Sequence, residues 1–214
     1  MARQEHSRRE EWANAITHGV GAGLSFAGLL VLVGAAAWHR DPWLIVSVSI
    51  YGASLVALYA TSTVYHAVRQ EAVKRVLEHL DHAAIFLLIA GTYTPFTLVN
   101  MRGPVGYWLF GIVWSLAALG ILYKIFSRHR FSNASVLLYL AMGWLIVGAL
   151  GKLMATTGTG GLWLLFSGGL AYSAGVIFYV WRRLPFNHAI WHLFVVSGSV
   201  LHYCAVLFYV VPKA

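Results

Sequence analysis

Three histidines near the ends of apolar segments have the spacing of metal ligands. His188 and His192 are four residues apart, so on a helix their imidazoles project from one face, one turn apart. His66 follows a hydroxyl residue, Ser62, at the same spacing. Three imidazoles with an open fourth position form the ligand set of a catalytic zinc site. The sequence therefore predicts that His66, His188 and His192 hold a divalent cation, expected to be Zn²⁺, although imidazole also suits copper, iron and nickel.

Asp81 is expected to lie beside these histidines, whereas the other acidic residues fall in predicted termini or loops. A carboxylate beside a divalent cation can take a proton from a nearby water molecule, which makes Asp81 a candidate catalytic base. The Ser62 hydroxyl could stabilise a developing oxyanion, so it is the second candidate catalytic group. Simpler interpretations stay open, because Asp81 could be a helix N-cap and a single histidine at a helix end often only reaches the membrane interface. His79 and His82 flank Asp81 and are candidate outer neighbours.

The composition of the chain indicates which kind of protein must position these residues. Of 214 residues, 59% are hydrophobic and only 10% are charged, against about 45–50% and about 25% in ordinary soluble domains. Soluble globular, disordered and collagen-like classes are therefore excluded, and the single Cys204 allows no disulfide within the chain. The net charge of +8 is not gathered in a basic cluster interleaved with aromatic residues, so no nucleic-acid partner is expected.

Long apolar stretches indicate the number of membrane crossings, because a helix needs about 20 mainly apolar residues to span the hydrocarbon core. Seven such stretches lie at 17–38, 43–65, 82–101, 104–123, 132–151, 160–181 and 188–211. An open sheet cannot span lipid, so the expected fold class is an all-α membrane protein with seven transmembrane helices. We expect a cytoplasmic segment at 1–16 and a single domain at 17–214. The first apolar run is too long for a cleaved signal peptide.

The lysine and arginine residues predict how the helices are oriented. Eleven fall on the side of the N-terminus and four on the other, which accounts for all 15. The positive-inside rule then places the N-terminus in the cytoplasm and the C-terminus outside. In this topology His66 ends the second span, Asp81 begins the third, and His188 and His192 begin the seventh. The candidate site residues thus converge on the inner leaflet from separate helices.

Polar residues before the first apolar run fall on one helical face and are expected at the same inner leaflet. They are Glu11, Asn14, Thr17 and His18. Glu11, Asn14 and His18 are therefore candidates for an outer shell that orients the metal ligands. The simpler interpretation is a hydrated helix entry with a local hydrogen-bond network.

Other patterns favour structural roles. Residues 69–81 carry valines and leucines at helical spacing, which predicts an amphipathic segment along the membrane interface. Gly19 and Gly23 form a G-x-x-x-G pair, which is typical of close helix packing in lipid. His202 lies about 15 Å beyond His192 along the same helix, so we expect a buried, hydrogen-bonded histidine outside the metal site.

Motifs in this order along the chain resemble those of one membrane-protein family. They are Glu11-x-x-Asn-Ala-Ile-Thr-His18, Ser62-x-x-x-His66, Asp81-His-x-x-Ile-x-x-Leu-Ile-Ala-Gly-Thr-Tyr-Thr-Pro-Phe96 and His188-x-x-x-His192. From residue 11 to 211 the chain resembles the hemolysin III family, the bacterial branch of the progestin and adipoQ receptors. The resemblance implies a bacterial inner-membrane protein with seven spans, a cytoplasmic N-terminus and a zinc ion on His66, His188 and His192. It also implies that Asp81 is reached through a water molecule and that Ser62 lies close by.

These expectations support two classes of function. The wider superfamily includes alkaline ceramidases, which are zinc amidases of membrane lipids, so the leading hypothesis is a zinc-dependent hydrolase of a lipid amide or ester. The alternative is a non-enzymatic regulator of membrane lipids, or a receptor-like sensor, with a structural zinc. The family name records cytolysis, but the sequence does not resemble a secreted cytolysin. A transporter or pore would need charged groups along the depth of the bundle, which the spans lack apart from His202. Membrane lipid is the expected partner.

Overall fold

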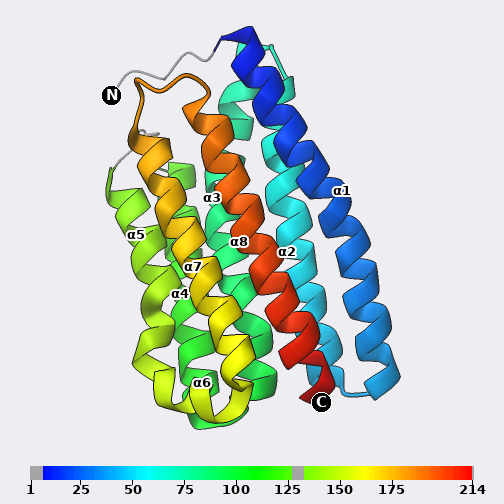
Figure 1. Ribbon diagram of the computed structural model, residues 1–214. Coiled ribbons are helices and arrows are strands. Elements are labelled where there is room, and N and C mark those ends of the chain that lie inside the picture. The colour runs from blue at the N-terminus through cyan, green and yellow to red at the C-terminus, as the bar shows by residue number, and fades with distance from the viewer. Residues whose placement is uncertain (1–6, 127–132, 214) are drawn as a thin grey trace.

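The computed structural model describes residues 7–126 and 133–213 as a bundle of helices (Figure 1). The helices are α1 (Arg8–His39), α2 (Pro42–Ala67), α3 (Glu71–Pro95), α4 (Pro104–Phe126), α5 (Asn133–Trp144), α6 (Leu150–Thr157), α7 (Thr159–Val180) and α8 (Asn187–Tyr209). Within these described ranges, seven helical segments are long and apolar enough to cross a membrane, which confirms the predicted all-helical, seven-span fold.

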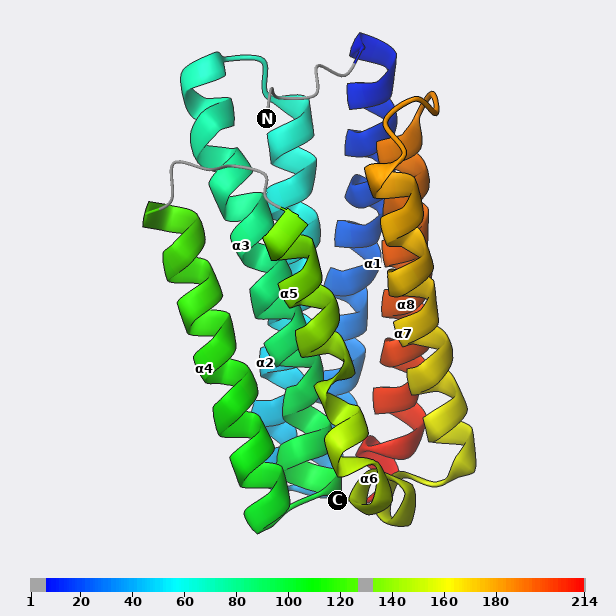
Figure 2. The ribbon, with the colours of Figure 1, turned by 90° about the vertical axis from the view of Figure 1, so that its left-hand side faces the viewer.

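Helices that follow one another in the sequence pack side by side, and the last helix, α8, packs against the first, α1. Helix α1 packs against α2 and α8, α3 lies against α2 and α4, and α7 packs against α8. Figure 2 shows α4 at the edge of the bundle opposite α7 and α8, with α5 between α4 and α7 in this view. The start of α1, the α2–α3 connection and the α7–α8 connection lie at one end, and the C-terminus lies at the other (Figure 1). Which side of the membrane each end faces stays a prediction.

Helix α1 begins well before the predicted start of the first span. Ser7 is its N-cap and forms a capping box with Glu10, in which each side chain bonds the backbone N–H of the other residue. This signal defines a helix start at Arg8. Residues 8–16, expected in a separate N-terminal segment, are therefore the first turns of the same helix, and residues 1–6 lie outside the described range.

Helix α3 also begins earlier than predicted, because no helix breaker separates residues 71–81 from the apolar run. Its N-cap is Gln70, so the interpretation of Asp81 as an N-cap is wrong, and Asp81 lies in the third turn. The predicted segment at 69–81 is thus part of α3 rather than a separate interfacial helix. The buried face of this segment is the polar one instead of the apolar one: Lys74, Glu78 and Asp81 are buried, whereas Val76 is 61% exposed.

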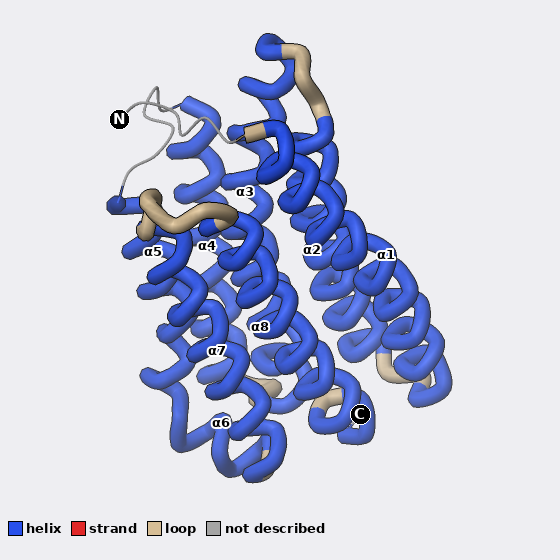
Figure 3. Tube along the Cα trace, turned by 45° about the horizontal axis from the view of Figure 1, so that its top comes forward, coloured by secondary structure: helices blue, strands red, loops and turns tan. Residues whose placement is uncertain are grey.

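The fifth crossing is interrupted where one continuous helix was predicted. Helix α5 ends at Trp144, and a 3₁₀ turn at Leu145–Ala149 leads into α6. The cause is the side chain of Tyr93 in α3, whose hydroxyl accepts from Ile146 N at 2.9 Å and lies 2.9 Å from the carbonyl oxygen of Met142. A side chain that inserts into the backbone ladder in this way breaks the α-helical pattern. Figure 3 shows that helices and short connections make up the described chain.

Close packing of α1 on α2 uses a glycine other than the predicted pair. A methyl group at Gly21 would come within 2.7 Å of the Tyr59 ring, whereas one at Gly23 would have no neighbour within 4 Å. Gly19 faces Thr63 at ordinary contact distance. The predicted role of Gly23 in helix packing is therefore wrong, and Gly21 allows α1 to approach Tyr59.

Candidate metal centre

The three predicted histidine ligands meet at one end of the bundle. His66 lies in the last turn of α2, and His188 and His192 lie in the first two turns of α8. One ligand atom from each lies within 4.8 Å of the other two. The ring centroids are 5.1 Å apart for His66 and His188, and 4.6 Å for His188 and His192. These three side chains are therefore close enough together to hold one metal ion.

The orientation of His66 is set by an acidic residue of α1. Oε2 of Glu11 lies 2.7 Å from Nδ1 of His66, and Nδ2 of Asn14 lies 3.5 Å from the same nitrogen. An ionised carboxylate only accepts hydrogen bonds, so Nδ1 of His66 must carry the proton and donate it. The neutral ring then keeps its lone pair on Nε2, the nitrogen available to a metal.

The orientation of His192 is set by a hydroxyl group that also belongs to α1. Oγ1 of Thr17 lies 3.2 Å from Nδ1 of His192, and it donates its own hydrogen to the backbone of α1, 2.9 Å from the carbonyl oxygen of Ala13. Thr17 must therefore accept from Nδ1–H of His192, which leaves the lone pair on Nε2. That Nε2 is buried with no hydrogen-bond partner. A metal ion would satisfy this atom, so the donor set fits a cation.

A fourth imidazole lies against the three. The ring of His18 stacks on His192 with centroids 3.4 Å apart and planes at 13°. The centroid of the His18 ring also lies 4.9 Å from that of Tyr59, with the two ring planes perpendicular. His18 is 2% exposed and lies outside the set of three ligands. It packs against a ligand without joining the group that can hold the ion.

The two candidate catalytic residues are buried on adjacent helices. Ser62 lies on α2, one turn before His66, and Asp81 lies on α3. Both residues are less than a tenth exposed. Asp81 lines the same cavity as His188. The structure thus brings Asp81 to the cavity that His188 also borders, and the catalytic roles of Asp81 and Ser62 stay predictions.

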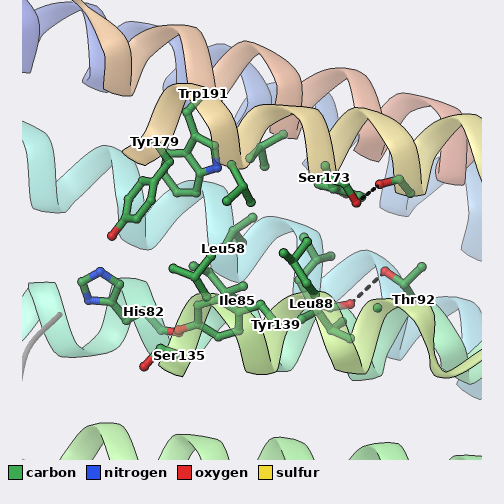
Figure 4. A pocket seen from close by; sticks show the side chains of 18 of the residues that line it. Leu58, His82, Ile85, Leu88, Thr92, Ser135, Tyr139, Ser173, Tyr179 and Trp191 are labelled. Carbon is green, nitrogen blue, oxygen red and sulfur yellow. Dashed lines mark hydrogen bonds between the residues drawn. The ribbon is translucent and has the colours of Figure 1, made fainter. Parts of the chain in front are cut away.

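This cavity runs from His188 into the apolar interior. It has a volume of about 170 Å³, and its walls come from α3, α5, α7 and α8, with smaller contributions from α1, α2 and α4. Figure 4 shows His82 and Tyr179 at one end, with Leu88, Thr92 and Ser173 further along. Its polar end carries the acidic and imidazole groups, and most of the remaining wall is aliphatic or aromatic. The shape and polarity suit a molecule with a polar group and an apolar chain.

The other histidines near the site have separate places. His82 lines the cavity, whereas Nδ1 of His79 lies 2.7 Å from the carbonyl oxygen of Arg75 in its own helix. Nε2 of His202 bonds the carbonyl oxygen of Leu165 at 3.0 Å, deeper along the cavity wall. His202 is thus a hydrogen-bonded histidine away from the three ligands, as expected.

Some polar residues at this end were missed or misplaced by the sequence analysis. Lys74 bonds Oε1 of Glu11 at 2.7 Å, and Glu78 is 1% exposed. The prediction that every acidic residue except Asp81 lies in a terminus or loop is therefore wrong, since Glu11 and Glu78 both face the bundle interior. The spacing of Lys74, Glu78 and Asp81, four and three residues apart, is a signal for one helical face that could have identified them.

Sequence comparisons place the chain among known proteins. A family model described as Haemolysin-III related matches residues 6–203. Hemolysin-3 of Bacillus cereus is 49% identical over 214 residues, covering 100% of this chain and 98% of that protein. Monocyte to macrophage differentiation factor of Homo sapiens is 34% identical over 209 residues, covering 92% of this chain and 83% of that protein.

A more distant relative comes from a plant. Heptahelical transmembrane protein ADIPOR2 of Oryza sativa subsp. japonica is 32% identical over 152 residues, covering 61% of this chain and 66% of that protein. No solved structure matches the chain. The family match, the relatives and the seven apolar helices agree with one another: the chain is a multi-pass bacterial membrane protein that belongs to the hemolysin III family, within the progestin and adipoQ receptors.

Proposed function

We propose that this protein is a zinc-dependent hydrolase of a membrane lipid amide or ester. The observation that carries the proposal is the placement of Asp81 and His188 on the wall of one largely apolar cavity, with His188 in the group of three histidines that can hold a metal ion. A general base and a metal ligand at the end of an apolar chamber form the arrangement that lipid hydrolysis needs.

His66, His188 and His192 would hold the ion, and their neutral imidazoles suit zinc. When bound, zinc supplies Lewis-acid chemistry, which polarises a carbonyl group and acidifies water. Glu11 and Thr17 keep the Nδ1 protons of His66 and His192 on the outer side of the rings. The chain itself therefore presents lone pairs, rather than N–H groups, to the cation.

Asp81 and Ser62 would act on the scissile group. The Asp81 carboxylate would accept the proton of the attacking water and pass it to the leaving amine or alcohol. The buried Ser62 hydroxyl would donate a hydrogen bond to the carbonyl oxygen as negative charge develops there. The buried positions of both residues would limit competition from bulk water.

The cavity supports the choice of substrate class. Aliphatic and aromatic side chains of α3, α5, α7 and α8 line most of its wall. Burial of an acyl chain there would contribute about 0.8 kcal/mol per CH₂ group. The polar end of the cavity would hold the amide or ester next to Asp81. A membrane lipid is therefore the proposed partner.

A regulator or sensor with a structural zinc is the second candidate. The ligands come from α2 and α8, so a bound ion would join the ends of two helices that are far apart in sequence. In that role the cation stabilises one arrangement of the bundle, and Asp81 has no chemical task.

The test is lipid turnover by purified, zinc-loaded protein on a panel of ceramides and phospholipids. Asp81→Asn should lower turnover about 10²–10⁴-fold, and Ser62→Ala about 10²–10³-fold, while both variants keep their zinc. Glu71→Gln, at an exposed position of the same helix as Asp81, is the matched control and should retain activity. Turnover that is absent from the wild type, or that does not depend on Asp81, would reject the hydrolase and favour the regulator.

A further inference from the structure

Lys74 is a buried lysine that none of the sequence motifs includes. It lies in the first turn of α3 with 6% of its surface exposed. Its ammonium group is 2.7 Å from Oε1 of Glu11 and 5.1 Å from the centroid of the Tyr65 ring. A lysine near a helix end normally extends its charge to the membrane interface. Here the side chain turns inward to Glu11 of another helix.

Glu11 uses a different oxygen for each of its partners. Oε1 accepts from Lys74, and Oε2 accepts from Nδ1 of His66, both at 2.7 Å. Both bonds are charge-assisted, and bonds of this kind are about twice as strong as neutral ones. The carboxylate is therefore held at both oxygens, so it cannot rotate away from His66 without losing Lys74.

We propose that Lys74 is a positioning residue for the metal centre, which acts through Glu11 to fix the orientation and tautomer of His66. The proposal rests on the metal site of the proposed function. Lys74 contacts Glu11 and Tyr65, and its effect on His66 passes through the Glu11 carboxylate, whose two oxygens bridge α3 and α2. Partners in this outer position usually contribute about 10- to 100-fold to metal affinity.

A purely structural role for Lys74 makes a different prediction. If the pair of Lys74 and Glu11 only ties α3 to α1, its removal lowers the melting temperature of the metal-free protein and leaves metal affinity unchanged. If Lys74 positions His66 through Glu11, its removal weakens metal binding, and it has no further effect once Glu11 has been neutralised.

The experiment measures Zn²⁺ affinity by chelator competition, together with thermal unfolding of the metal-free protein. The variants are Lys74→Met, Lys74→Arg, Glu11→Gln and the double variant Lys74→Met with Glu11→Gln. Lys152→Met, which removes an exposed lysine at the other end of the bundle, is the matched control. The absorption spectrum of Co²⁺ bound in place of zinc reports the ligand geometry independently of activity.

We expect Lys74→Met and Glu11→Gln each to weaken zinc binding about 10- to 100-fold. The double variant should bind like Glu11→Gln alone. Lys74→Arg, which keeps the charge, should stay within about threefold of the wild type, and the control should bind normally. The Co²⁺ spectrum should change in Lys74→Met and be restored in Lys74→Arg.

Two results would overturn this proposal while the proposed function stands: wild-type zinc affinity in Lys74→Met, or additive losses in the double variant. If Lys74→Met does not fold, Lys74→Gln replaces it under the same criteria. A wild-type protein that binds no zinc would instead remove the metal centre, and the role of Lys74 would fall with it.

Discussion

Thr17 accepts a hydrogen bond from Nδ1 of His192 across 175 residues of sequence, with 3.2 Å between the two atoms. This hydrogen bond corresponds to the one from Nδ1 of His66 to Glu11, but its acceptor is a neutral hydroxyl group instead of a carboxylate. One face of α1 thus contacts a metal-site histidine of α2 and another of α8, although α1 supplies none of the three ligands. The first turns of α1 therefore lie against two of the histidines of the candidate metal centre.

Removing the Thr17 hydroxyl should weaken the metal centre. In Thr17→Val the Nδ1 proton of His192 loses its acceptor, so we expect zinc affinity to fall about tenfold, whereas Thr17→Ser should restore it. Chelator competition gives both values. Thr156→Val is the control, because that hydroxyl donates to the carbonyl oxygen of Lys152 in its own helix, α6, away from the three histidines. Equal affinity of Thr17→Val and wild type would contradict the orienting role.

His192→Ala should abolish the binding of one metal ion per chain. The substitution removes one of three imidazoles that can share an ion, and two histidines alone bind zinc weakly. Elemental analysis of purified protein compares this variant with the wild type and with His39→Ala, an exposed histidine at the opposite end of the bundle. We expect about one zinc per chain in the wild type and in the His39 variant. The same metal content in all three proteins would exclude this site.

Filling the cavity should change which lipids are accepted and leave metal binding unchanged. Gly143 lines the cavity, and a side chain added there would meet no atom within 4 Å of its Cβ. We expect Gly143→Leu to lower activity on long acyl chains more than on short ones. Gly111→Leu, another open glycine position that does not line the cavity, is the control. A chain-length profile that does not change would show that the acyl chain binds elsewhere.

Gly21 and Gly23 offer a matched pair for stability. Gly21→Ala places a methyl group within 2.7 Å of the Tyr59 ring, and such overpacking typically costs about 1–3 kcal/mol. Gly23→Ala meets no neighbour and should be neutral or gain up to about 1 kcal/mol in helix propensity. Thermal unfolding in detergent would measure the difference. If Gly21→Ala is as stable as Gly23→Ala, the approach of α1 to Tyr59 is looser than the structure indicates.

The apolar runs predicted the spans, and the distribution of Lys and Arg predicted that the candidate residues share one end of the bundle. Both patterns can be identified because they depend on residue type alone. The i, i+4 pair of His188 and His192 could be identified for the same reason. The start of α3 could not, since hydropathy counts Lys74 and Glu78 as polar residues outside the membrane, whereas their burial depends on partners in other helices. The break after Trp144 depends on the Tyr93 hydroxyl, which lies 53 residues before Ile146.

The inward polar face of α3 has a consequence for biosynthesis. A helix that carries Lys74, Glu78 and Asp81 on one side is expensive to place in lipid alone, since insertion scales assign about 2.5–3.5 kcal/mol to one such residue at mid-membrane and less near the surface. Helices α1 and α2 leave the ribosome first, so Glu11 of α1 is already present to pair with Lys74 when α3 emerges. The third span is therefore expected to enter the bilayer against a preassembled hairpin, and deleting α1 should impair its insertion.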